Sequence, residues 1–205
     1  MGIALYNAIN INKEPLVKFK ILCALLLSFC IQSAQAEIKN SQNLFGGLLT
    51  RAGVKNQKPL SQQELVSLCE QGYTKAFYLY SGAPTTQVSC SKGTIRYQSS
   101  GTFFSPENID KTLDNIESGM RTREKTFVHC NNGAHASGFV AAIALRSFCG
   151  ISGDQAVRYW DKTLKGYDLQ EPNRSKLMSR IRNYQPRSNL KLNEGQKSAL
   201  GCSNY

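Results

Sequence analysis

The sequence predicts one α/β domain, in which a mostly parallel sheet is flanked by helices. Three observations predict this fold class. Short apolar runs of strand length alternate with longer segments of helical periodicity between residues 61 and 184. Apolar residues make up 41% of the chain and charged residues 19%, a balance that allows a buried core. The length of 205 residues leaves room for one ordinary domain.

The first 36 residues resemble a secretory signal peptide. Lys18 and Lys20 precede an apolar run over 21–31, which is shorter than the roughly 20 residues that a membrane-spanning helix needs. Ala34 and Ala36 then supply the small residues that precede a cleavage site, so we expect cleavage after Ala36. The alternative is a buried core helix. A signal peptide implies export, so we expect the protein in the periplasm or fully secreted.

The next helix and three strands follow from capping and apolar patterns. Ser61 and Glu64 form a capping box that opens a helix, which runs to about Gln71 and ends at Gly72. Apolar or alternating runs after it are typical of strands, at 75–80, 85–91 and 94–97.

The second half continues the alternation. Pro106 opens a helix whose Ile109, Leu113 and Ile116 fall on one buried face. The remaining predicted elements are a strand at 125–129, a central buried helix at 138–148 and helices at 152–160 and 172–184. We therefore expect a folded domain over 37–186 and an irregular tail over 187–205.

The cysteine count predicts two disulfides. Of seven cysteines, two fall in the leader and five follow it, an odd number for an oxidising compartment. Four structural cysteines allow three pairings, and the sequence does not choose among them. We predict Cys69–Cys90 and Cys149–Cys202, with Cys130 left free.

The net charge of +11 is concentrated late in the chain. A basic face could attract nucleic acid, anionic lipid or a phosphorylated ligand, or it could be the solvated face of a helix. No aromatic-interleaved motif accompanies the charge, so no nucleic-acid partner is expected. The basic residues are Arg174, Lys176, Arg180, Arg182, Arg187, Lys191 and Lys197.

The segment 128–138 contains the candidate catalytic and anion-binding residues. It lies between a predicted strand and a buried helix, at the sheet edge where α/β proteins bind ligands. The N–H groups and dipole of a helix N-terminus favour an anion, and they also favour the thiolate form of a nearby cysteine such as Cys130. Gly133 allows a tight turn. Both histidines of the chain, His129 and His135, lie in this segment.

This segment resembles the signature loop V-H-C-x-x-G-x-x-R-[S/T]-G of the cysteine-dependent protein tyrosine and dual-specificity phosphatases. The order of the flanking elements over about residues 45–165 is similar too, beginning with Leu49-Thr50-Arg51 and Pro59. The resemblance implies a dual-specificity-phosphatase-like fold. The matching loop positions are Val128, His129, Cys130, Gly133, Ser137 and Gly138.

The resemblance also implies roles. Cys130 would be the nucleophile, Ser137 would assist departure of the thiolate, and His129 would be the buried residue that supports it. No cofactor or metal is implied, and a metal site from His129, Cys130 and His135 lacks an evident fourth ligand. The loop positions expected to surround an anion are Asn131, Asn132, Gly133, Ala134, Ala136 and Gly138.

Two departures from the family pattern put turnover in doubt. Ala136 stands where the family has its phosphate-binding Arg, and the expected general-acid loop over 98–104 contains no Asp or Glu. Glu107 and Asp110 lie beyond that loop and are poor substitutes. Each loss should cost about 10²–10⁴ in rate. No nearby arginine replaces the missing one, whether Arg121, Arg123 or Arg146.

Three functions remain open. The first is a degenerate phosphatase that binds a phosphate-like group on a small molecule or protein with weak or no turnover. The second is an active atypical phosphatase in which His135 compensates for the missing Arg. The third is unrelated thiol chemistry by Cys130 and His135. The alternative to all three is that neither residue has a function. Cys130 would then be an inert relic of an ancestral active site, and His135 would be a solvent-facing loop residue.

Overall fold

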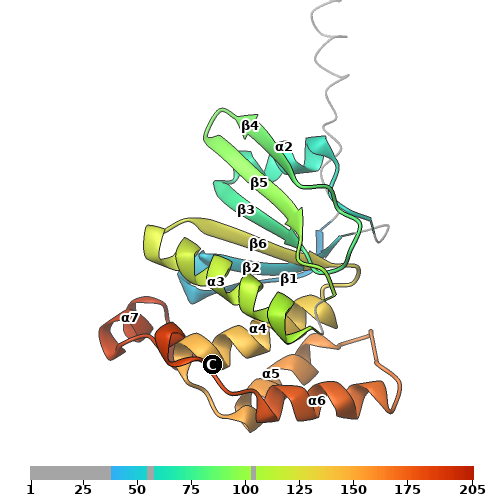
Figure 1. Cartoon of the computed structure of the whole chain (residues 1–205), viewed down its shortest axis with the longest axis vertical. Helices are drawn as coiled ribbons and strands as arrows, with labels where there is room; N and C mark the ends of the chain where they lie inside the picture. Colours follow the sequence, from blue (N-terminus) through green and yellow to red (C-terminus); the bar gives the residue numbers. More distant parts are fainter. Residues whose placement is uncertain (1–37, 55–57, 103–104) are drawn as a thin grey trace, which may run out of the picture. The chain divides into compact units, whose positions relative to one another are not determined.

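The computed structural model describes residues 38–54, 58–102 and 105–205. Within them a six-stranded sheet has the order β1-β2-β6-β3-β5-β4 (Figure 1). The four central strands run parallel, and each edge strand is antiparallel to its neighbour, which confirms the mostly parallel sheet. The strands are β1 (Ile38–Leu44), β2 (Leu49–Val54), β3 (Tyr73–Tyr78), β4 (Thr86–Cys90), β5 (Gly93–Ser99) and β6 (Lys125–Cys130).

Helices pack against both faces of this sheet. On one face, α2 (Gln62–Glu70) packs on inward side chains that include Ala76 and Phe127. On the other face, helices pack on the alternate strand residues, Phe77 and Val128 among them. The helices of this second face are α3 (Pro106–Thr122), α4 (Ala136–Ala144), α5 (Gly153–Thr163) and α6 (Asn173–Asn183), and α5 and α6 lie beyond α4 in Figure 1.

The predicted capping signals are present. Ser61 with Glu64 and Ser152 with Gln155 form complete capping boxes at the starts of α2 and α5. The predicted helix at 138–148 starts earlier, at Ala136, and its last turn is a π-helical segment over Leu145–Cys149. The predicted leader over 1–36 lies outside the described residues. No helix among those described is long and apolar enough to cross a bilayer.

The tail is more ordered than predicted. The irregular segment expected over 187–205 contains α7 (Glu194–Ala199), which Asn193 and Gln196 open with a third capping box. Leu190 and Leu200 on either side are buried in the main core. A helix of six residues with no buried residue of its own has too little periodicity to be predicted from sequence.

The disulfide prediction is confirmed. Cys69 bonds to Cys90, and Cys149 bonds to Cys202, which ties the C-terminal segment to the end of the α4 region. Cys130 is free and buried. The segment 128–138 therefore keeps a free thiol.

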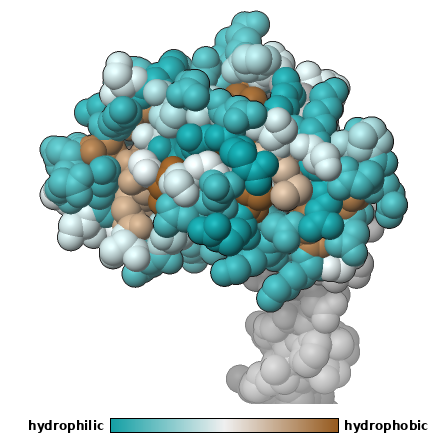
Figure 2. All heavy atoms as spheres, turned by 90° about the horizontal axis from the view of Figure 1, so that it is seen from below, coloured by the Kyte–Doolittle hydropathy of each residue, from teal (hydrophilic) through white to brown (hydrophobic). Residues whose placement is uncertain are grey.

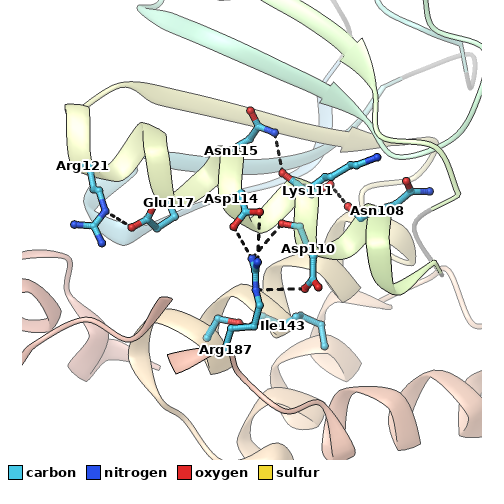
Figure 3. A network of polar contacts seen from close by, with 11 residues as sticks. Asn108, Asp110, Lys111, Asp114, Asn115, Glu117, Arg121, Ile143 and Arg187 are labelled. Atoms are coloured by element: carbon cyan, nitrogen blue, oxygen red, sulfur yellow. Dashed lines mark hydrogen bonds and ion pairs between the residues drawn. The ribbon is translucent and has the colours of Figure 1, made fainter. Parts of the chain in front are cut away.

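Much of the late basic charge is paired with carboxylates. Arg174 and Arg182 bond to acids of α5, and Arg187 lies 2.5 Å from Asp114 of α3 (Figure 3). The face seen in Figure 2 is mostly hydrophilic, and its apolar areas are small and separate. The ion pairs of these arginines favour a solvated, charge-paired helix face over a basic docking surface.

Candidate active site

Cys130 ends β6 and begins the loop that leads into α4. Its side chain is 1% exposed, and its Sγ lies 3.3 Å from Ser137 Oγ in the first turn of α4. The contact brings the two ends of the loop together. The structure thus places the predicted nucleophile beside the hydroxyl predicted to assist it.

The carbonyl oxygens of the loop are held from outside by the scaffold. Arg51 Nη1 donates to Gly133 O at 2.6 Å, Thr163 Oγ1 to Ala134 O at 3.1 Å, and Trp160 Nε1 to His135 O at 3.1 Å. Asn40 Nδ2 adds a longer contact of 3.5 Å to Asn132 O. Donors from β1, β2 and α5 therefore fix consecutive peptide groups of the loop.

This arrangement also orients the loop N–H groups. In a trans peptide the N–H of each residue points opposite to the preceding C=O. The N–H groups of residues 133–136 accordingly point away from β1, β2 and α5. None of them donates a hydrogen bond to another described residue. Unpaired N–H groups at the start of a nine-residue helix are suited to an anion.

Two glycines let the loop lie directly on β2. Gly133 has φ +72°, in the left-handed region that favours glycine. A Cβ at Gly53 would come within 3.0 Å of the backbone of Asn132 and Gly133, and a Cβ at Gly133 would in turn overlap Gly53. The contact between the two backbones therefore excludes any side chain at either position.

His129 is buried behind the loop as a neutral imidazole. Leu60 N–H donates to Tyr97 OH at 3.0 Å, and Tyr97 OH shares a hydrogen bond of 2.9 Å with His129 Nε2. The other ring nitrogen, Nδ1, has no partner among the described residues. Burial lowers the pKa of His129 to about 3.

This burial predicts a pH-dependent stability. Unfolded chains protonate His129 below its ordinary pKa of 6.5, whereas the folded chain does so only near 3. The stabilisation is therefore complete above pH 6.5 and is lost as pH falls towards 3, by about 1.4 kcal/mol per pH unit. Denaturant unfolding between pH 6.5 and 4 should show this extra loss in wild type relative to His129→Gln.

The matched control introduces His129→Gln into a His135→Gln background, where the other histidine is already absent, and the same extra loss should again disappear. Parallel pH dependence of unfolding in wild type and His129→Gln would contradict the assignment of a buried neutral imidazole.

His135 has a partner other than the thiol. It is the N-cap residue of α4, and its Nε2 lies 2.5 Å from Tyr167 O, in the segment after α5. The interaction ties the loop to that segment. No hydrogen bond joins His135 to Cys130 in the described structure, so the geometry does not place His135 as a base on the thiol.

In the described part of the chain, position 136 holds no donor side chain, and the carboxylates nearest to the expected acid loop are ion-paired. The Ala136 side chain is fully buried. Glu107 pairs with Lys111, and Asp110 lies against Arg187 (Figure 3). In the expected acid loop, the described residues 98–102 contain no carboxylate, and 103–104 lie outside the described residues.

Sequence reasoning assigned no site role to several residues that the structure places around the loop. Arg51 was assigned only to an entry segment, although its guanidinium holds the loop. Tyr78 and Tyr80 were assigned only to a strand, but Tyr78 OH donates to Asn131 Oδ1 at 3.3 Å. Burial is the largest cause that raises the pKa of both phenols. Tyr78 therefore remains a neutral donor to the loop. Among the described residues, no group of three His, Cys, Asp or Glu could hold a metal.

Comparisons with known proteins bear on the fold. The sequence matches no protein-family model and no curated protein. A mouse "putative dual specificity phosphatase", solved with zinc tungstate, matches with a TM-score of 0.51 at 12% identity, over 80% of this chain and 97% of that one. The chain has the dual-specificity phosphatase fold.

Other solved phosphatases align less closely. P. aeruginosa TpbA in complex with phosphotyrosine matches with a TM-score of 0.48 at 11% identity, over 83% of this chain and 98% of that one. Human DUSP28 matches with a TM-score of 0.48 at 12% identity, over 71% and 91%. A likeness at this level of identity concerns the fold alone.

Proposed function

We propose that the loop over residues 130–138 binds a tetrahedral oxyanion, such as the phosphoryl group of a small molecule or protein. The observation that carries this proposal is the orientation of the loop peptides. Their carbonyls are held by outside donors, and the N–H groups of residues 133–136 are left without partners. A bound oxyanion would satisfy these donors and the dipole of α4 together.

The same site is poorly equipped for turnover. Without a guanidinium at position 136, transition-state charge on the phosphoryl oxygens loses about 3–6 kcal/mol of stabilisation. Without a carboxylic acid, the leaving group must depart unprotonated, at a further cost of about 10²–10⁴ in rate. We therefore expect binding with weak or no phosphatase activity.

An active atypical phosphatase remains the second candidate because the thiol is intact. Cys130 is free and lies against Ser137, which are the two groups that a phosphocysteine mechanism would use. His135 would have to leave Tyr167 O to act in it. No contact in the described structure supports the third possibility, unrelated chemistry by Cys130 and His135.

We also propose that the protein is exported. The two disulfides suit an oxidising compartment, as does the signal-like leader over 1–36. Intact mass of the exported protein should show cleavage after Ala36, and retention of the leader would contradict it.

The functional proposal is tested by pairing a binding assay with a turnover assay. Tungstate should bind to wild type and to Cys130→Ser, as measured by isothermal titration. Hydrolysis of a small aryl phosphate should be near background in both proteins. Turnover that disappears only in Cys130→Ser would favour the active phosphatase, and absence of tungstate binding in both would refute the oxyanion site.

A further inference from the structure

Arg51 is a buried cation on the outer side of the loop. It lies in the middle of β2 and is only 4% exposed. Its Nη1 donates to Gly133 O and, at 3.0 Å, to Asn40 O. Its other nitrogens donate to Gln42 Oε1 at 2.9 Å and to Tyr159 OH at 3.0 Å. Four of the five N–H donors of the guanidinium are thus used in hydrogen bonds, one of them to the loop itself.

All of these partners are neutral. Two are backbone carbonyls and one is an amide oxygen, and burial raises the pKa of Tyr159 to about 12, so its phenol stays protonated. No ion pair joins Arg51 to a carboxylate among the described residues. Buried charges are ordinarily paired. This one lacks a counter-charge within the described structure.

The contact with Gly133 O directs the charge towards the proposed oxyanion position. Arg51 polarises the peptide between Gly133 and Ala134, whose N–H points to the opposite side. An anion bound to that N–H would face Arg51 across a single peptide group. The sequence offered no sign of this, because Arg51 and Gly133 are 82 residues apart.

We propose that Arg51 supplies the fixed positive charge of the oxyanion site from behind the loop, in place of the guanidinium missing at position 136. The inference rests on the proposed oxyanion site. Arg51 acts through the Gly133–Ala134 peptide, so it is a positioning residue. Its charge also determines which ligand charge the site prefers. A fixed positive charge at this place implies that the site prefers dianions over monoanions of the same shape.

The test uses two tetrahedral oxyanions of similar size and different charge, tungstate (2−) and perrhenate (1−). Gln42→Glu places a carboxylate on Arg51 with no change of side-chain length, and its oxygen still accepts from Arg51 and from Tyr159. Because charge–charge energy scales with ligand charge, tungstate should bind roughly tenfold more weakly and perrhenate only about threefold. Titration measures tungstate, and competition against tungstate measures perrhenate.

Matched variants separate charge from structure. Gln196→Glu adds the same charge within the capping box of α7 and should change neither affinity. Arg51→Lys keeps the charge and should keep the ratio of the two affinities, even if both weaken. Arg51→Met removes the charge and should lower the ratio of tungstate to perrhenate affinity further than Gln42→Glu does. Should it fail to fold, Gln42→Glu still decides.

The outcomes are distinguishable from failure of the proposed function. If wild type does not bind tungstate, the oxyanion site itself is refuted. If wild type binds but Gln42→Glu weakens both anions by the same factor, or neither, then Arg51 acts as structure only and the inference is overturned.

Discussion

Replacing Gly53 by Ala is expected to abolish oxyanion binding. The new methyl group would overlap the backbone of Asn132 and Gly133, neither of which can move as a flexible side chain could. The loop would have to lift from β2, and Gly133 O would leave Arg51. We expect tungstate affinity to fall about a hundredfold or more and the free energy of unfolding to fall by about 1–3 kcal/mol. Isothermal titration and denaturant unfolding measure the two effects.

Gly195→Ala is the matched control for this substitution. Gly195 lies in α7, where an added Cβ meets only the Asn193 side chain, at 3.4 Å. Alanine should be tolerated there and should leave tungstate binding unchanged. Wild-type tungstate affinity in a folded Gly53→Ala protein would show that the loop position is not needed for the site.

Restoring an arginine at the loop should strengthen binding instead. In Ala136→Arg, a guanidinium at the family position would make two charge-assisted hydrogen bonds to the oxyanion, each worth about 1.5–3 kcal/mol. Tungstate should therefore bind about a hundredfold or more tighter. Hydrolysis of aryl phosphate should stay low because residues 98–102 still supply no acid.

Ala136→Met controls for the added bulk at this buried position, since it extends the side chain without adding charge or donors. It should bind tungstate no better than wild type. If Ala136→Arg folds and its tungstate affinity is unchanged, the loop is not an intact phosphate cradle.

Local signals in the sequence predicted most of the fold. Capping residues at Ser61 and Ser152 and the apolar periodicity of α3 act within a few residues, so they are legible in the chain. β1 was missed because its polar sequence forms an edge strand with a bulge between Lys39 and Gln42. β2 was recognised only as an entry segment, since Arg51 and Gly53 are not typical strand formers.

The candidate site was only partly predictable for a related reason. The positions of Cys130, Ser137 and Gly133 are set by their own segment. The donors that hold the loop come from residues far away in the chain, and nothing local marks them. Arg51, Thr163 and Trp160 meet the loop only because β2 and α5 pack against it.

The most direct test of the account is where on the backbone the anion binds. In ¹H–¹⁵N spectra of the protein titrated with tungstate, the amides of Gly133, Ala134, His135 and Ala136 should shift most and saturate together, in wild type and in Cys130→Ser alike. Saturable shifts confined to basic residues of α6 such as Lys176, or no saturable shift at all, would contradict the oxyanion loop.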